Sequence, residues 1–307
     1  MTIIKQLALG LGRTEADIVK FLVNAPKKYK VYTIPKRTSG HRVIAQPSKE
    51  LKVFQRKFME LYELPVHKAA MAYREKLSIK NNAQSHQKNN FLLKIDLENF
   101  FNSINCSVFW KEWLNFYPLP GHEDKLAFEN LLFWAPSKAL GGKLILSIGA
   151  PSSPLLSNFI MHRFDEIISR ECSLLNVTYT RYADDLTFST DVKNVLFDIP
   201  DMVEKYLLLH FEGALKINKK KTIFSSKAHN RHVTGVTLNN DGELSLGRER
   251  KRYIKHLIYQ YKLNRLNEDN LSHLKGLLAF SHHIEPVFIQ ALIYKYSAET
   301  INKITGR

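Results

Sequence analysis

The sequence predicts an α+β fold, and three observations support this prediction. Two runs rich in β-branched and aromatic residues, 176–181 and 186–190, predict the strands of a hairpin. The apolar run 91–95, which is followed by Asp96, predicts a third and buried strand. Apolar residues at helical spacing recur elsewhere, most clearly in the basic segment after Gly247. A few strands among many helices are typical of an α+β protein.

The elements before the first strand are mostly helical. A capping-box pattern at Thr14 predicts a short helix, which should end before Pro26 because proline cannot continue it. The segment 27–42 is basic, and 51–64 has helical spacing. Polar residues dominate 80–90, which predicts a polar connection to the first strand.

The later elements alternate helices with one more hairpin. Helical spacing predicts four further helices, at 108–116, 125–134, 155–172 and 203–210. The pair Asp241-Gly242 predicts the tight turn of a hairpin over 238–244. After Gly247, one helical face is apolar and should pack on a core; it carries Ile254, Leu257, Ile258 and Tyr261.

The composition favours a polyanionic partner. The 307 residues include 45 Lys and Arg against 29 Asp and Glu, which gives a formal net charge of +16 and a pI of about 9.6. Such an excess suits nucleic acid or an anionic membrane surface. No apolar run approaches the roughly 18 residues of a membrane span, and the N-terminus does not resemble a signal peptide. Cys106 and Cys172 have no disulfide or metal-site spacing, so we expect a cytoplasmic protein with reduced thiols and no membrane association.

Three carboxylates are the strongest chemical signal in the chain. Tyr182-Ala183-Asp184-Asp185 places two adjacent anions at the tip of the predicted hairpin, where a bound cation would offset their repulsion. Asp96 adds a third carboxylate, as a two-metal phosphoryl-transfer site requires, and oxygen ligands suit Mg²⁺. A solvated Asp-Asp turn and a helix cap at Asp96 are the alternatives.

With further motifs in order, the chain resembles a reverse transcriptase, specifically one of the retron type. The general motifs are 32–36 with 42–44, 94–101, 149–154 with 157–158, 182–185, and 215–218 with 221–222. Asn82-Ala83-Gln84-Ser85-His86 and Val233-Thr234-Gly235 resemble two signatures of retron enzymes. Two positions depart from the pattern: Ile148 stands where many reverse transcriptases have Gln, and 70–73 stands where the family often has Gly-Phe.

The resemblance implies a right-hand polymerase architecture with fingers, an antiparallel-sheet palm and a helical thumb. We expect fingers with an N-terminal helical extension at 1–90 and the thumb at 237–307. The palm should span 91–236, with elements of the fingers inserted around 105–145.

The resemblance also implies RNA-directed DNA polymerase activity with two Mg²⁺ ions per active site. Asp96, Asp184 and Asp185 would be catalytic and would hold the metal together with the backbone carbonyl of Leu97. The expected nucleotide-binding residues are Lys36, Arg42, Phe101, Ala150 and Lys221. Phe101 would exclude a ribose 2′-hydroxyl while Phe100 packs in the core. Ordinary surface charge is the alternative for the three basic residues, and core packing is the alternative for Phe101.

A final set of residues is expected to contact RNA or the template–primer duplex. It comprises Asn82, His86, Val233, Thr234, Gly235, Arg248, Arg252, Lys255, Tyr259 and Lys262. For Asn82 and His86 a purely structural contact is the alternative. For the last five residues, which share one face of the tail, the alternative is a solvated surface.

The resemblance implies a specific set of partners. They are deoxynucleoside triphosphates, a cognate structured non-coding RNA and its short DNA copy, a retron effector protein in anti-phage defence, and a host RNase H. The DNA would stay joined to RNA through a branch primed by a 2′-hydroxyl. A reverse transcriptase of the group II intron or diversity-element type, or a catalytically silent RNA-binding protein, are the alternatives.

Overall fold

A four-stranded antiparallel sheet is the centre of the computed structural model, which describes residues 1–36, 40–139 and 141–306. The strand order is β4-β5-β3-β6. The strands are β3 (Phe91–Asp96), β4 (Thr178–Tyr182), β5 (Asp185–Thr190) and β6 (Ile223–Ser226). The three strands predicted here from β-branched, aromatic and apolar runs are therefore present, with ends shifted by at most a few residues.

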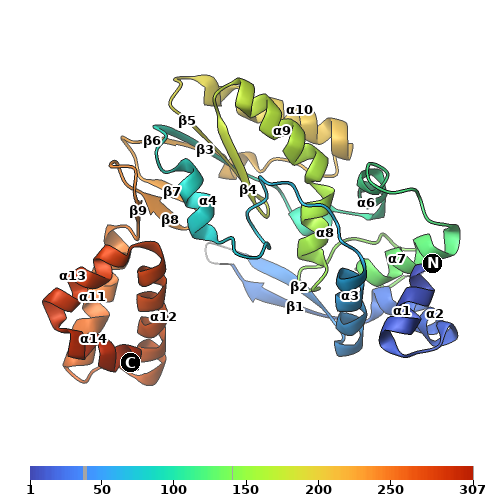
Figure 1. Ribbon diagram of the computed structural model, residues 1–307, viewed down its shortest axis with the longest axis horizontal. Coiled ribbons are helices and arrows are strands. Elements are labelled where there is room, and N and C mark those ends of the chain that lie inside the picture. Colours follow the sequence, from blue (N-terminus) through green and yellow to red (C-terminus); the bar gives the residue numbers. More distant parts are fainter. Residues whose placement is uncertain (37–39, 140, 307) are drawn as a thin grey trace.

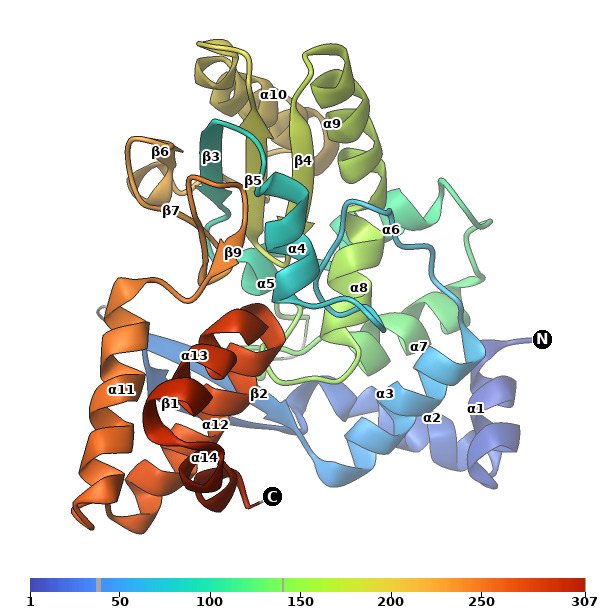
Figure 2. The same ribbon diagram turned by 60° about the vertical axis from the view of Figure 1, so that its left-hand side comes forward.

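The register of the sheet gives it two different faces. Leu93 and Ile95 of β3 belong to the larger hydrophobic cluster, which includes residues of α9 (His162–Leu174) and α10 (Ile199–Phe211). Asp96 pairs with Asp185 and, because side chains alternate along a strand, points to the other face. Helix α4 (Ile79–His86) covers that face (Figures 1 and 2).

The N-terminal part forms a second layer around an aromatic core. Helices α1 (Ile3–Leu11), α2 (Glu15–Val23), α3 (Lys49–Leu61) and α7 (His122–Leu132) pack together, and a short hairpin of β1 (Tyr29–Pro35) and β2 (His41–Pro47) extends from them with only its base buried. Thr14 caps α2 by accepting the Asp17 N–H at 3.2 Å, and the helix ends before Pro26 as predicted. Phe54 and Phe58 of α3 are fully buried in the larger cluster.

The C-terminal part forms a small sheet and a helical bundle. Strands β7 (Arg231–Val233), β8 (Val236–Leu238) and β9 (Leu244–Ser245) form an antiparallel sheet, and Gly242 has a φ of 79° in the predicted Asp-Gly turn. The helices are α11 (Arg248–Lys262), α12 (Glu268–Ile284), α13 (Pro286–Tyr296) and α14 (Ala298–Thr305). Ile254, Leu257 and Ile258 are buried in a second hydrophobic cluster, and Tyr261 packs against it. The bundle lies at the opposite end of the molecule from α1 and α2 (Figure 1).

Two predictions about secondary structure were wrong. The predicted helix 155–172 is two helices, α8 (Ser153–Ile160) and α9, which meet at Met161. The polar segment 80–90 contains α4, which begins at a capping box between Ser78 and Asn81. Its buried face carries Asn82, Ala83 and His86, so the apolar periodicity that identifies a helix is missing.

The remaining short elements connect these parts. They are η1 (Ala25–Lys27), α5 (Phe100–Ser103), α6 (Cys106–Trp113), η2 (Val195–Phe197) and η3 (Lys219–Lys221). Among the described residues, no helix combines the length and the apolar character that are needed to cross a bilayer.

Candidate active site

The fold brings the three predicted carboxylate residues to one end of the central sheet. Asp96 is the last residue of β3 and lies opposite Asp185, the first residue of β5. The Leu97 N–H donates to the carbonyl of Asp184 at 3.0 Å, which ties the end of β3 to the turn between β4 and β5. The Leu97 backbone, the predicted carbonyl ligand, is therefore next to the carboxylates.

Mutual repulsion and burial raise the pKa of two of these carboxylates. Burial is the main cause for Asp184, and the charge of Asp96 adds to it. The pKa of Asp185 rises to about 6, first through desolvation and then through the charges of Asp184 and Asp96. Acids whose charged forms are disfavoured in this way gain from a nearby cation.

A lysine supplies a cation in this structure. The Lys221 ammonium donates to both oxygens of Asp96, at 2.9 and 3.1 Å, and Asp96 raises the pKa of that lysine. Asn218 also donates to Asp96 Oδ1, at 3.0 Å. Within the described ranges, no group of three His, Cys, Asp or Glu side chains is close enough to hold a metal ion by itself. The donors nevertheless fit a hard cation, because all are oxygens and an ammonium already binds one of them.

A cavity of about 300 Å³ contains two of the predicted nucleotide-binding residues. Phe101 and Ala150 line it together with Tyr73. Phe100 is only 2% exposed and belongs to the core, whereas Phe101 is half-buried. Gly149 lets the loop approach the fingers hairpin closely, since a Cβ there would lie 3.0 Å from the Ala45 carbonyl oxygen.

The two predicted fingers cations lie on the hairpin β1–β2. Lys36 and Arg42 are both exposed. The charge of Arg42 still reaches the carboxylates, because it opposes the rise in the pKa of Asp184. Arg42 of the β1–β2 hairpin and Lys221 of η3 therefore both act electrostatically on Asp184.

The Asn82–His86 motif forms a buried chain of hydrogen bonds. The Thr180 hydroxyl donates to Asn82 Oδ1 at 2.6 Å, so it must accept the Nε2 proton of His86, at 2.7 Å. His86 Nδ1 then accepts from Ser189 at 2.7 Å. This assignment is that of a neutral imidazole, which burial favours by lowering the pKa of His86 to about 3.

The burial of these side chains favours the structural alternative for the Asn82–His86 motif. Asn82, His86 and Val233 are all fully buried, so their side chains cannot contact RNA in this structure. Asn82 and His86 instead join α4 to β4 and β5, while Val233 packs in the second cluster. Asn82 Nδ2 also reaches the Thr234 hydroxyl at 3.5 Å, which connects the two retron-like motifs.

Three other predicted contacts border a large basic groove. Gly235, Arg248 and Arg252 line a volume of about 1420 Å³ between the small sheet and the start of α11. Further along α11, Tyr259 and Lys262 are exposed. The Lys255 ammonium lies 5.8 Å from the Phe288 ring centroid, and this cation–π contact holds it against the bundle.

Several residues near the site escaped the sequence analysis. Lys52 and Arg56 of α3 line the same cavity as Phe101, but basic residues on an amphipathic helix carry no distinguishing signal. Asp165 and Arg181 form a fully buried ion pair beside the turn between β4 and β5, which carries Asp184. The sequence does contain a sign that Asp165 is buried, because Asp165 lies at helical spacing with the apolar residues Ile168 and Cys172.

Comparisons with known proteins agree with this geometry. A family model described as "Reverse transcriptase (RNA-dependent DNA polymerase)" matches residues 34–238. The Retron Ec83 reverse transcriptase of Escherichia coli is 46% identical over 278 residues, which cover 90% of this chain and 89% of that protein. The Retron Ec73 reverse transcriptase of Escherichia coli is 32% identical, with 91% and 90% covered.

Solved structures with a similar arrangement include a telomerase and a viral enzyme. Telomerase from Candida albicans, bound to a fragment of telomeric RNA, has a TM-score of 0.48 at 14% identity, and the match covers 91% of this chain and 61% of that one. The foamy viral protease-reverse transcriptase, bound to double-stranded DNA, has a TM-score of 0.46 at 15% identity, with 91% and 43% covered. This chain thus spans less than two thirds of either structure.

The antiparallel palm sheet, the helical thumb and the family match together define an RNA-directed DNA polymerase of right-hand architecture. The chain belongs to the reverse transcriptase family, and within it to the retron type. The predictions of fold class, family and enzyme activity are confirmed. Membership of this family implies dependence on a divalent metal ion and a nucleic acid partner.

Proposed function

We propose that this chain copies its own structured non-coding RNA into a short single-stranded DNA, by two-metal nucleotidyl transfer, as part of a retron in anti-phage defence. The observation that carries the proposal is the meeting of Asp96, Asp184 and Asp185 at one end of the palm sheet. The similarity to retron reverse transcriptases over most of the chain supports the choice of template.

The reaction joins a hydroxyl to a deoxynucleotide. A terminal hydroxyl attacks the α-phosphorus of a deoxynucleoside triphosphate, and pyrophosphate leaves. Two Mg²⁺ ions, when bound, would lower the pKa of the attacking hydroxyl and stabilise the leaving oxygens. Asp96 and Asp184 would hold both ions, with the Leu97 carbonyl as a further ligand and Asp185 in support.

Cationic side chains would neutralise the negative charge of the triphosphate. Lys36 and Arg42 would neutralise its oxygens from the fingers side. The Lys221 ammonium contacts Asp96 in this structure, and it would move to the leaving pyrophosphate and donate a proton to it. Phe101 and Ala150 would form the sugar pocket, in which the Phe101 ring excludes a 2′-hydroxyl.

The thumb would hold the nucleic acid. Arg248 and Arg252 at the start of α11 border the large groove together with Gly235, and the charge of the two arginines suits phosphates of the RNA and of the growing duplex. The domains proposed are fingers at 1–90, palm at 91–236 with fingers elements around 105–145, and thumb at 237–307. Most of the second hydrophobic cluster comes from residues between 238 and 304, which supports a separate core for the thumb; Leu92, Val233 and Val236 of the palm pack into it.

The proposed partners follow from this role. The DNA product would remain linked to the RNA by a 2′-hydroxyl-primed branch, a host RNase H would remove the copied template, and an effector protein would use the complex. All of these steps would take place in the cytoplasm.

Asp184→Asn tests the catalytic assignment. The change removes one charge and nearly preserves the shape, so folding should survive while primer extension on an RNA template with Mg²⁺ falls by about 1,000-fold or more. Glu75→Gln, at an exposed position, is the matched control. Activity of Asp184→Asn near that of wild type, with a normal thermal melt, would contradict the two-metal proposal.

A further inference from the structure

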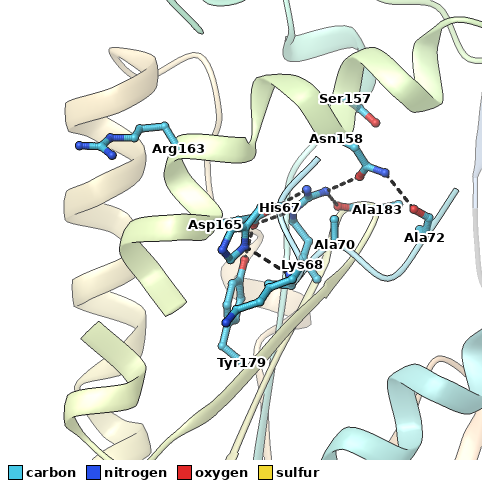
Figure 3. Close-up of polar contacts among 12 residues, drawn as sticks. His67, Lys68, Ala70, Ala72, Ser157, Asn158, Arg163, Asp165, Tyr179 and Ala183 are labelled. Carbon is cyan, nitrogen blue, oxygen red and sulfur yellow. Dashed lines mark hydrogen bonds and ion pairs between the residues drawn. The ribbon is translucent and has the colours of Figure 1, made fainter. Parts of the chain in front are cut away.

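The fully buried ion pair between Asp165 and Arg181 adjoins the catalytic turn. Arg181 Nε donates to the two Asp165 oxygens at 2.9 and 3.1 Å, and Nη2 donates to Oδ2 at 2.6 Å. The Tyr179 hydroxyl also donates to Asp165, at 2.8 Å, so several donors fix the carboxylate (Figure 3).

The other end of the guanidinium holds groups on two further segments. Arg181 Nη1 donates to the carbonyl of Ala183 at 3.1 Å and to Asn158 Oδ1 at 3.2 Å. Asn158 Nδ2 donates in turn to the carbonyl of Ala72 at 2.9 Å (Figure 3). Ala72 precedes Tyr73, which lines the nucleotide cavity. One buried cluster thus contacts both the catalytic turn and the wall of that cavity.

The catalytic turn needs outside support. Ala183 is the first central residue of a two-residue hairpin turn and has a φ of 57°, in the left-handed region where such turns usually take glycine. The Arg181 bond to the Ala183 carbonyl lies on one side of the turn. The Leu97 bond to the Asp184 carbonyl lies on the other. The direction of the Asp184 side chain depends on both.

Stability alone gives little reason for this ion pair. Apolar residues of similar volume often replace a buried ion pair with no loss of stability, because desolvation offsets the attraction of the charges. What apolar residues cannot replace is the donor that Arg181 directs at Ala183. We propose that Asp165, Arg181 and Asn158 are positioning residues, which fix the catalytic turn for Asp184 and, through Ala72, the wall of the nucleotide cavity. The inference rests on the proposed catalytic role of Asp184.

An apolar replacement of the cluster separates positioning from folding. The variant Tyr179→Phe/Asp165→Leu/Arg181→Met removes the charges and the hydroxyl that would lose its acceptor. We expect a folded variant with a somewhat lower melting temperature, because the Asn158 and Ala183 oxygens lose their donor. We also expect an unchanged KM for template–primer and a kcat for single-nucleotide addition lower by about 100-fold. A folded variant with a kcat within about twofold of wild type would overturn the proposal.

If the triple variant does not fold, Arg181→Lys still tests whether Arg181 positions the turn. Lysine preserves the charge opposite Asp165, but its single ammonium cannot also reach Ala183 and Asn158. We expect a folded protein with a lowered kcat, whereas a normal kcat would overturn the proposal. Asn158→Ala should mainly raise the KM for the deoxynucleotide, because it releases Ala72, and an unchanged KM would remove Asn158 from the cluster.

Two controls distinguish this inference from the proposed function. Arg163→Met/Glu166→Leu removes an exposed ion pair from the same helix and should leave kcat unchanged. If Asp184→Asn retains activity, the catalytic assignment itself fails. If Asp184→Asn is inactive while the folded triple variant is fully active, only the positioning role fails.

Discussion

Phe100 and Phe101 show how two identical neighbours take different places. Phe100 belongs to the large core, whereas Phe101 lines the cavity of about 300 Å³ and lies edge-on to Tyr73, with ring centroids 6.4 Å apart. The sequence could show only that one of the pair had to be buried. The direction of each ring depends on α5, a helix of 4 residues whose start at Asn99 has a positive φ of 45°.

Shortening Phe101 should weaken the selection against ribonucleotides. Phe101→Val opens space beneath the sugar, so we expect the preference for deoxynucleotides over ribonucleotides in kcat/KM to fall by about 10-fold to 100-fold. Phe100→Val is the matched control and should mainly lower the melting temperature, because it leaves a cavity in the core. Unchanged discrimination in Phe101→Val would show that the sugar gate lies elsewhere.

The buried imidazole of His86 makes a pH prediction possible. Its pKa is lowered to about 3 by burial, against 6.5 for the free side chain, so the unfolded state binds a proton that the folded state cannot. Stability from this group is complete above about pH 6.5 and is lost as the pH falls towards 3, by up to about 1.4 kcal/mol per pH unit.

Urea unfolding at pH 7.5 and at pH 5.5 measures this contribution. His86→Gln should be less stable than wild type at pH 7.5, by about 1–3 kcal/mol, but should lose less stability on acidification. His256→Gln, on the exposed side of α11, should behave as wild type. An equal loss in wild type and in His86→Gln would show that the imidazole is not the titrating group.

At the scale of elements, apolar periodicity decided what the sequence could predict. The strands of the palm and the apolar face of α11 carry regular patterns, and the structure has them where the patterns lie. Helix α4 was missed because it is attached to the sheet by hydrogen bonds of Asn82 and His86, whereas other helices pack through apolar side chains. The break between α8 and α9 was missed because their apolar residues continue across Met161.

Some residues of the candidate site could be predicted from the sequence, and others could not. Asp96, Asp184 and Asp185 follow from short motifs, because each motif sits at a strand end and strand ends converge. The contacts of Arg181 could not be predicted, because they join α8, α9 and the 69–73 segment across long distances in sequence. Only the tertiary structure brings those segments together.

Charge reversal tests the basic face of α11, on which Arg252 is exposed and Lys255 is half-buried against the bundle. Arg252→Glu/Lys255→Glu should weaken template–primer binding and reduce the slope of log K against log salt by about 1.5, since fewer counterions are released. Lys5→Glu/Lys20→Glu makes the same change in charge on exposed residues at the far end of the molecule and is the control (Figure 1). Equal salt slopes in both variants would indicate that this face of α11 is only a solvated surface.

At the scale of the whole molecule, the two faces of the palm sheet pack against two different hydrophobic clusters. One face packs on α9 and α10, where Arg181 and Asp165 lie, and the other meets α4 and the thumb-side cluster. Helix α4 contacts both the palm and the thumb, since Lys80 donates to the His283 carbonyl at 2.7 Å. Asp96 and Asp185 face the same side of the sheet as α4.

The central claim is that this polymerase acts on one dedicated RNA. Phosphate contacts give affinity without sequence choice, so selection of one template must come from RNA shape and unpaired bases. Purifying the protein from its native host and sequencing the nucleic acid bound to it tests the claim directly. We predict a single species that contains RNA and DNA joined through a nuclease-resistant branch; a mixture of cellular RNAs without attached DNA would contradict it.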